Sequence, residues 1–366
     1  MAKLDDMLKK IVELGASDLH FSSDIAAMCR IDGSMQLLEE GSKPIPPNEM
    51  RVFLKEVCTE EAWAEFEETH DTDFAYEIAD VGRFRANYFY DNRGPGGVFR
   101  VIPSKIPTAE ELNLPKSILR FCELRKGLVV VTGPTGSGKS TTLAAMMDHI
   151  LKTRTDHIIT IEDPIEFVYP SGKSLVNQRQ VGKHTGSFKR ALRAALREDP
   201  DIVLVGEMRD LETVEIAIET AETGHLVFGT LHTTTASSTI NRIVDQFPAD
   251  RQAQIRTMLA DSLKGVVAQN LCKKVGGGRV AALEILVTNL AVAANIRESK
   301  IHAIANAMQV GRSIGMQTLN DHLMEHVQNN LVEPNEAYSR AADKSDMQNK
   351  LNTAGFAVDA SGLNEA

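Results

Sequence analysis

The chain has 366 residues, of which 43% are hydrophobic and 25% charged. This composition excludes a disordered, collagen-like or coiled-coil protein, and the length predicts two globular domains. Lys and Arg number 40 against 50 Asp and Glu, and the resulting net charge of −10 gives no support for nucleic-acid binding. Four scattered cysteines without a CxxC pair exclude a zinc ribbon and favour a reducing cytosol.

The N-terminal ten residues carry charges throughout and lack the apolar core of a signal peptide. The stretch nearest to a membrane span, residues 280–296, contains Glu284 and several polar residues, so we expect no span there. The sequence therefore predicts a soluble, cytoplasmic protein, and docking on a membrane protein stays open.

The first hundred residues combine helical and strand patterns. Residues 1–14 space their apolar side chains as an amphipathic helix does, and residues 49–68 are expected to form one or two further helices. Alternating polar and apolar residues predict antiparallel strands at 27–31, 74–78, 83–90 and 97–102. These patterns predict a small α+β domain over residues 1–102, followed by a proline-punctuated linker at 103–115.

From residue 116 the pattern changes to buried strands that alternate with helices. The strands are expected at 128–131, 157–161, 202–205 and 226–230. Such alternation predicts an α/β domain over residues 116–340, with a mainly parallel sheet, helices on both faces and a helical C-terminal region. The small, polar residues 341–366 are expected to form a loosely packed tail.

Residues 133–140 read GPTGSGKS and satisfy the phosphate-binding pattern GxxxxGK[ST] in full. A predicted strand precedes them and a predicted helix follows, so backbone N–H groups and the helix N-terminus are placed to bind phosphate. Lys139 is expected to neutralise the β- and γ-phosphates of ATP, and the Ser140 hydroxyl to ligate Mg²⁺. The predicted nucleotide-binding residues are Gly133, Pro134, Thr135, Gly136, Ser137, Gly138, Lys139, Ser140 and Thr141.

Hydrolysis also requires acids that hold magnesium or orient water, and two predicted strands end in acids. Residues 201–207 end in Glu207, with Gly206 where a magnesium-binding aspartate is usual. Residues 159–166 carry Glu162 and, beyond a proline, Glu166. We predict that Glu207 polarises the attacking water, with Glu162 as the alternative base, and both belong to the candidate magnesium shell. The competing interpretation is that these acids cap or solvate strand ends.

Two histidines, His225 and His232, flank the predicted strand at 226–230. Ligands bind at the carboxyl ends of parallel strands, so His232 is a candidate catalytic residue. A third ligand at metal spacing is missing from the sequence around them, and the pair therefore does not predict a zinc site.

Seven Lys and Arg and no acid lie between Lys173 and Arg197, and residues 188–197 have the pattern of a basic amphipathic helix. The aromatic residues that a nucleic-acid surface would interleave are missing from this helix. A subunit interface or a nucleotide-proximal surface is therefore the favoured interpretation, with a solvated face as the alternative.

Taken in order along the chain, these motifs resemble the secretion ATPases of the type II secretion and type IV pilus systems. The matching segments are residues 16–20 (ASDLH), a Walker A segment at 133–140, an Asp box at 160–167, an atypical Walker B at 204–210 and a His box at 224–233. The specific match is to the retraction, or twitching-motility, ATPases of type IV pili. This resemblance implies a PAS-like N-terminal domain joined to a RecA-like ATPase domain, assembled as a homohexamer.

The resemblance also assigns roles that the residues alone do not. Arg83, Arg85 and Arg100 stand where the family's nucleotide-contacting arginines lie, whereas alternation alone would place Arg83 and Arg85 on the solvated face of a strand. The implied function is an ATP-driven motor that retracts the pilus at the cytoplasmic face of the inner membrane. The implied partners are further copies of the chain, the inner-membrane platform protein and, indirectly, the pilin fibre; no nucleic acid is expected.

Two sequence features favour retraction over other functions within the family. Extension and secretion ATPases usually carry an additional N-terminal domain and a tetracysteine zinc motif, and we expect this chain to lack both. Residues 294–298 (ANIRE) partly match the C-terminal signature of the retraction ATPases, with Ile296 expected to pack inward and Arg297 and Glu298 expected at the surface. An accessory retraction paralogue, or an extension or secretion ATPase, stays open. Outside the family, the alternatives are a RecA-like nucleic-acid translocase and a P-loop scaffold without turnover.

Overall fold

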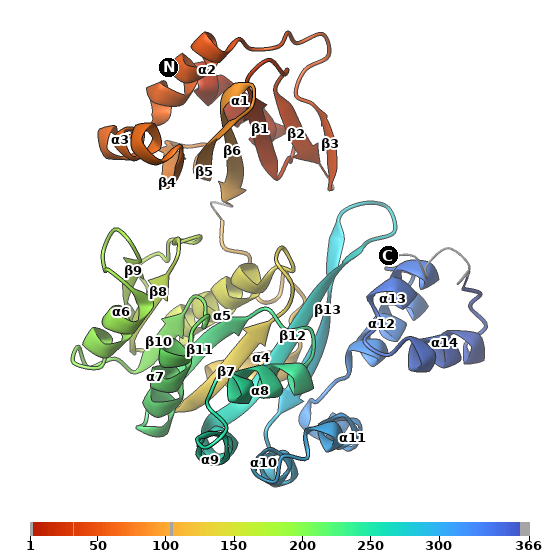
Figure 1. Cartoon of the computed structure of the whole chain (residues 1–366). Coiled ribbons are helices and arrows are strands. Elements are labelled where there is room, and N and C mark those ends of the chain that lie inside the picture. Colours follow the sequence, from red (N-terminus) through yellow and green to blue (C-terminus); the bar gives the residue numbers. More distant parts are fainter. Residues whose placement is uncertain (1–2, 32, 103–104, 359–366) are drawn as a thin grey trace. The chain divides into compact units, whose positions relative to one another are not determined.

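The computed structural model describes residues 3–31, 33–102 and 105–358. Its contacts divide the chain into two compact units, Met1–Lys105 and Ile106–Ala366 (Figure 1). This boundary falls within the predicted linker at 103–115, of which residues 103 and 104 lie outside the described residues. Each unit has its own sheet and its own hydrophobic core.

The N-terminal unit is built on a six-stranded antiparallel sheet in the order β3-β2-β1-β6-β5-β4. Its strands are β1 (Asp18–Ser22), β2 (Met28–Ile31), β3 (Ser34–Leu37), β4 (Asp71–Ile78), β5 (Gly82–Asp91) and β6 (Gly94–Ile102). Its helices are α1 (Lys3–Glu13), α2 (Pro47–Val57) and α3 (Glu60–Thr69). The predicted α+β character is confirmed, whereas the sequence pattern does not predict the short strands β1 and β3.

The two faces of this sheet differ because side chains alternate along each strand. Phe84 and Tyr88 of β5 are fully buried in a core shared with apolar residues of the three helices. Arg83 and Arg85 occupy the opposite face of the same strand, and Arg100 is the cross-strand partner of Arg85. The three arginines predicted from the family resemblance therefore share one face of one sheet.

The second unit is built on a seven-stranded sheet in the order β13-β12-β7-β11-β10-β8-β9. Neighbouring strands are parallel except β13, which pairs antiparallel with β12. The strands are β7 (Gly127–Thr132), β8 (His157–Glu162), β9 (Leu175–Gln180), β10 (Ile202–Val205), β11 (Leu226–Leu231), β12 (Leu263–Lys273) and β13 (Arg279–Val287). The predicted mainly parallel sheet is confirmed.

Helices pack on both faces of this sheet, as the sequence predicts (Figure 1). On one face, α4 (Lys116–Cys122) and α5 (Lys139–Thr153) contribute Phe121, Met146 and Ile150 to a buried cluster. The other face is packed by α6 (Phe188–Ala195), α7 (Leu211–Glu222), α8 (Ala236–Asp245), α9 (Gln252–Ser262), α10 (Leu290–Arg297) and α11 (Ile304–Val310), with the short turns η1 (Ile301–Ala303) and η2 (Gly311–Ile314).

The stretch nearest to a membrane span in the sequence, residues 280–296, is divided between strand β13 and helix α10. Across the described ranges, no helix combines the length and the apolar character that crossing a membrane requires. The hydrophobicity of this stretch instead serves the core, since Ile285, Leu286, Val292 and Ile296 are fully buried.

Three helices complete the second unit: α12 (Leu319–Gln328), α13 (Pro334–Arg340) and α14 (Lys344–Thr353). Met347 and Leu351 of α14 are fully buried in a cluster with residues of α12, α13 and the β12–β13 pair. The prediction of a loosely packed tail from residue 341 is therefore wrong through α14, because two apolar residues four apart give this polar helix a buried stripe. Residues 359–366 of that predicted tail lie outside the described residues.

The predicted basic helix at 188–197 is shorter than expected. Helix α6 ends at Ala195, and Leu196, which lies within the predicted helix, is 37% exposed. Leu192 is fully buried, as the amphipathic pattern predicts. Lys189 pairs with Glu212 of α7 at 2.5 Å, so part of the positive charge is balanced within the unit. The functional role of this surface stays a prediction.

Candidate functional site

Four adjacent parallel strands end at the same edge of the second unit's sheet. β7 leads into the phosphate-binding loop, β8 ends at Glu162, β10 leads to Glu207 and β11 leads to His232. The carboxyl ends of the strands form the ligand-binding edge of an open parallel sheet. The strand order therefore brings together residues that are far apart in the sequence.

Glycines shape the phosphate-binding loop because the loop packs closely against β12. The φ angles of Gly133 and Gly138 are +148° and +86°. A Cβ on Gly133 would lie 2.2 Å from the carbonyl oxygen of Gln269, and one on Gly138 would lie 2.8 Å from its side-chain nitrogen. Only glycine fits both positions. Gly133, Pro134, Thr135, Gly136, Ser137 and Gly138 form the loop, and Lys139, Ser140 and Thr141 form the first turn of α5.

The ammonium group of Lys139 lies against the loop backbone. Its Nζ donates to the carbonyl oxygens of Gly133 at 2.7 Å and Pro134 at 3.1 Å. Burial lowers the pKa of Lys139, an effect that the charges of Glu207 and Glu166 oppose. Among the described residues no carboxylate lies within ion-pair distance of this Nζ. A partly buried cation held only by carbonyl oxygens favours an anionic ligand such as a phosphate.

Glu207 lies between Arg209 and His232. Its Oε1 is 2.6 Å from Arg209 Nε and 2.9 Å from His232 Nε2. Burial acts to raise the pKa of Glu207, but the hydrogen bonds and charges of Arg209 and His232 outweigh it and hold this pKa below its usual value. Glu207 is therefore an ionised carboxylate at neutral pH, and the structure places His232 beside it.

Glu162 is buried at the end of β8. Its Oε1 accepts hydrogen bonds from Thr160 Oγ1 at 2.5 Å and from Gln178 Nε2 at 3.1 Å. Burial raises the pKa of Glu162, and these two hydrogen bonds only partly counteract that effect. A carboxyl group with a raised pKa is suited to accept a proton near neutral pH. The geometry is thus compatible with Glu162 as the alternative base.

Gly206 stands directly against β8. Its N–H donates to the Ile161 carbonyl at 2.7 Å, and a Cβ would lie 3.0 Å from that oxygen. Its own carbonyl accepts a hydrogen bond from Thr230 Oγ1 at 2.5 Å. The crowding around this backbone gives a physical reason for a glycine where an aspartate is usual, with the acid provided one residue later by Glu207.

The three arginines of the N-terminal sheet each lie beside an acid. The pairs are Arg83 Nε with Glu77 at 3.7 Å, Arg85 Nε with Asp73 at 3.5 Å and Arg100 Nε with Asp18 at 2.8 Å. Asp18 is buried, whereas the Arg100 side chain is 62% exposed. Asp18 therefore fixes one side of an arginine whose end reaches the surface, a role that the sequence does not reveal.

The two histidines that flank β11 in the sequence lie at its opposite ends. His225 precedes the strand and places its Nδ1 3.1 Å from the carbonyl oxygen of Thr220. Only His232 lies at the carboxyl end, beside Glu207. In the part of the chain that the structure describes, no group of three His, Cys, Asp or Glu side chains could hold a metal by itself.

Sequence reasoning misses three residues that contact the site: Gln269 of β12, Gln178 of β9 and Arg209. Gln269 is detectable only as a polar residue inside the apolar run 263–272. Such a residue is expected to be buried and hydrogen-bonded, but its partner is not readable from the pattern. The partner depends on which strand lies next to β7.

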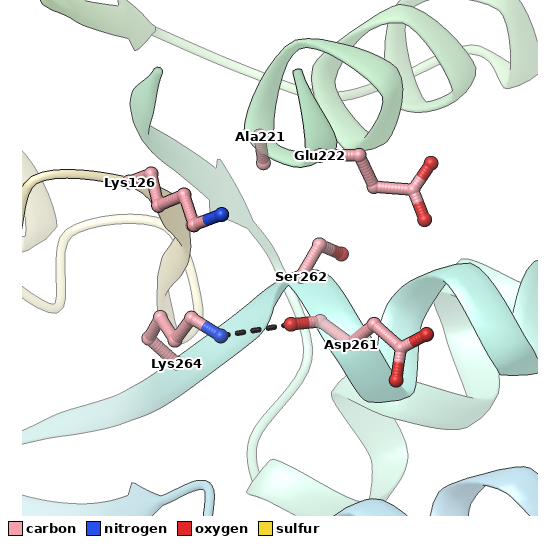
Figure 2. A pocket seen from close by; sticks show the side chains of 7 residues that line it. Lys126, Ala221, Glu222, Asp261, Ser262 and Lys264 are labelled. Atoms are coloured by element: carbon pink, nitrogen blue, oxygen red, sulfur yellow. Dashed lines mark hydrogen bonds between the residues drawn. The ribbon is translucent and has the colours of Figure 1, made fainter. Parts of the chain in front are cut away.

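A separate pocket lies at the amino end of β7, opposite the phosphate-binding loop. Its volume is about 210 Å³, and its lining residues are Lys126, Gly127, Ala221, Glu222, Asp261, Ser262 and Lys264. Figure 2 shows the Lys126 and Lys264 side chains on one side of it, with Lys264 Nζ donating to the Asp261 carbonyl at 2.8 Å. None of the predicted nucleotide-binding residues lines this pocket.

The partial C-terminal signature lies next to this pocket. Ile296 of α10 is fully buried, as predicted, while Arg297 Nη2 pairs with Asp261 Oδ1 at 3.0 Å. Glu298 pairs with Lys300 at 2.7 Å. Arg297 and Glu298 are both exposed, as the sequence predicts. Each takes part in an ion pair within the unit.

The fold and the site define a P-loop protein of the class that binds and hydrolyses nucleoside triphosphates, because a GxxxxGK[ST] loop leaves a parallel sheet beside two acidic strand ends. Such a combination of sheet, loop and acids recurs in proteins of many functions. The chain belongs to the Type II/IV secretion system protein family, whose model matches residues 1–363.

Individual relatives are more specific. The chain is 50% identical over 338 residues to the Type IV pilus retractation ATPase PilT of Pseudomonas aeruginosa, which covers 92% of this chain and 98% of that protein. It is 52% identical over 283 residues to a twitching motility protein of Neisseria gonorrhoeae. That match covers 77% of this chain and 76% of the Neisseria protein. A crystal structure of the pilus retraction motor PilT with bound ADP matches with a TM-score of 0.87 at 45% identity, over 95% of this chain and all of that chain. The resemblance to retraction ATPases is confirmed.

Proposed function

We propose that the chain is an ATP-hydrolysing motor that retracts a type IV pilus by pilin disassembly and so supports twitching motility. The observation that carries this proposal is the convergence of the phosphate-binding loop, Glu162, Glu207 and His232 at one edge of the sheet. The 50% identity to a retraction ATPase along nearly its whole length supports the particular function.

ATP binds through its phosphates to the loop at 133–138 and the first turn of α5. Lys139, whose ammonium donates to two carbonyl oxygens of the loop, provides the positive charge for the β- and γ-phosphates. Ser140, with Glu162 and Glu207 at the same edge, would hold Mg²⁺, an ion that takes few protein ligands besides phosphate and water. When bound, magnesium neutralises phosphate charge.

Glu207 orients and polarises the attacking water, and His232 and Arg209 hold its carboxylate in place. Glu162 is the alternative base, and its raised pKa is the property that favours it. Arg83, Arg85 and Arg100 stabilise charge on the phosphoryl group, so the rate depends on domain closure. These arginines are suited to that role because they share one face of a sheet.

The motor works as a homohexamer at the cytoplasmic face of the inner membrane. A closed ring of identical subunits is the expected arrangement when one unit completes the site of another. Its partner there is the inner-membrane platform protein of the pilus, through which it acts on the pilin fibre. The family membership of the chain and its similarity to a pilus retraction motor support this arrangement.

Phosphate release by the purified full chain tests the enzymatic part of the proposal. ATP with Mg²⁺ should be turned over, and neither DNA nor RNA should stimulate the rate. Nucleotide binding without turnover would indicate a P-loop scaffold instead, and stimulation by nucleic acid would indicate a translocase.

Deletion of the gene tests retraction itself. The deletion strain should accumulate surface pili and lose twitching motility, because pilin polymerises without being withdrawn. Expression of the wild-type chain should restore motility, and expression of a Lys139→Ala variant should not. A strain that loses its surface pili instead would contradict retraction and indicate an extension motor.

A further inference from the structure

Gln269 of β12 is a buried residue with both ends of its side-chain amide hydrogen-bonded. Its Nε2 donates to the Ser137 carbonyl at 2.7 Å, and its Oε1 accepts from Thr142 Oγ1 at 2.7 Å. Only 3% of the residue is exposed. One amide thus binds both the phosphate-binding loop and the helix that follows it, from a strand that no recognised motif includes.

The same residue contacts the loop near both of its ends. Its main-chain carbonyl oxygen would lie 2.2 Å from a Cβ on Gly133, and its side-chain nitrogen would lie 2.8 Å from a Cβ on Gly138. Gly138 also has a φ of +86°. Glycine adopts this conformation without steric strain, and it exchanges readily with other backbone conformations. A hydrogen bond to the peptide that precedes this glycine restricts the orientations that the peptide can adopt.

The peptide bond between Ser137 and Gly138 explains why this contact matters for a ligand. A trans peptide is planar, and its C=O and N–H point in opposite directions. Gln269 holds the Ser137 C=O toward β12. The Gly138 N–H of the same peptide must therefore point away from β12, and backbone N–H groups of such a loop are the donors that bind phosphate.

We propose that Gln269 is a positioning residue for nucleotide binding, which holds the Ser137–Gly138 peptide so that the Gly138 N–H is aimed at a phosphate. The proposal rests on the assignment of the loop as the ATP site. The donor is aimed before the ligand arrives, so binding does not require the glycine to be ordered at that moment.

Affinity for ADP tests the proposal directly, because the loop contacts phosphates that ADP retains. Gln269→Leu removes both hydrogen bonds at similar side-chain volume. We expect about tenfold weaker ADP binding in isothermal titration calorimetry of the full chain, the size of one hydrogen bond to a charged group. Gln317→Leu is the matched control: Gln317 Nε2 donates to the Leu283 carbonyl at 2.9 Å on β13, so this variant should bind ADP as the wild type does.

A second variant separates aiming of the donor from packing. Gln269→Glu keeps the shape and can still accept from Thr142, but as a carboxylate it cannot donate to the Ser137 carbonyl. Once protonated it can donate, and burial favours the protonated form. We expect weaker ADP binding than the wild type at pH 8 and recovery relative to the wild type at pH 6, a pH profile that a merely structural role would not produce.

The possible outcomes separate this proposal from the assignment of the ATP site. Wild-type affinity in folded Gln269→Leu, with folding checked by circular dichroism, would overturn the proposal. If that variant fails to fold, Gln269→Glu decides: unchanged affinity at pH 8, or no recovery at pH 6, would overturn it. A wild-type chain that does not bind ADP would instead overturn the ATP site itself.

Discussion

At the scale of single residues, two glutamates at one sheet edge have opposite electrostatic environments. Arg209 and His232 keep the pKa of Glu207 low despite its burial, whereas burial raises the pKa of Glu162. An ionised carboxylate held in place suits the orientation of a water, and a carboxyl group with a raised pKa suits proton transfer near neutral pH. Their environments thus distinguish two residues that the motifs alone leave as alternatives.

Glu207→Gln is expected to leave ATP binding nearly intact and to lower turnover at least about a hundredfold, because the amide has the same shape but lacks the negative charge that polarises the attacking water. Phosphate release and binding of a fluorescent ATP analogue measure the two effects. Glu212→Gln is a matched control, since Glu212 pairs with Lys189 on α6 and not with the site residues. Loss of turnover in Glu162→Gln, with turnover retained in Glu207→Gln, would reverse the assignment.

At the scale of elements, the β12–β13 pair connects the phosphate-binding loop with the C-terminal helices. Gln269 of β12 lies opposite Leu283 of β13, and the Leu283 N–H donates to His322 Nδ1 of α12 at 2.9 Å. Burial, together with the neighbouring His326, lowers the pKa of His322 to about 4, although the hydrogen bond from Leu283 acts in the opposite direction. The imidazole is therefore neutral in the folded chain at neutral pH.

Protonation of His322 should make the chain less stable in mild acid. The pKa of His322 is about 4 in the folded chain, against its ordinary value of 6.5. At a pH between these two values, the unfolded chain therefore binds a proton on His322 that the folded chain does not bind. The contribution of the neutral imidazole to the free energy of unfolding is fully present above pH 6.5 and is lost as the pH falls toward 4. Between pH 7 and pH 5 the free energy of unfolding should fall by about 2 kcal/mol.

His322→Asn removes this titration and should flatten the dependence of the urea-unfolding free energy on pH between 7 and 5. His302→Asn replaces an exposed histidine of η1 and should retain the wild-type dependence. The same loss of stability in the His322 variant as in the wild type would show that another group is responsible.

At the scale of the whole molecule, the candidate catalytic groups are divided between two compact units. The phosphate-binding loop and the glutamates belong to Ile106–Ala366, and the three arginines belong to Met1–Lys105. A reaction that needs both sets depends on the association of two units, within a subunit or between subunits. In the proposed mechanism one subunit completes the site of another, and for that case the division is a physical reason to expect an assembly.

Light scattering of the full chain at micromolar concentration, with ATP and Mg²⁺, should give six times the 40.1 kDa subunit mass. Glu207→Gln keeps ATP bound in the proposed mechanism and should give the same mass without consuming the nucleotide. A monomer under these conditions would contradict the homohexamer.

Local signals in the sequence were sufficient for the four strands that lead to the site and for its central chemistry. Four apolar strand segments, a glycine-rich loop and acids at strand ends each depend on residues that are close in the sequence. The parallel arrangement then requires Glu162, Glu207 and His232 to lie at one edge with the loop. For this reason the candidate site was predictable without knowing the order of the strands.

Only the tertiary structure decided which residues support that site. Gln269 and Ser137 are 132 positions apart, and they meet because β12 pairs with β7. Helix α14 has too few apolar residues to predict its own burial, yet Met347 and Leu351 fill a cluster that α12, α13 and the β12–β13 pair leave open. Such contacts depend on the packing of distant segments, and a local pattern carries no information about a neighbour that the fold alone provides.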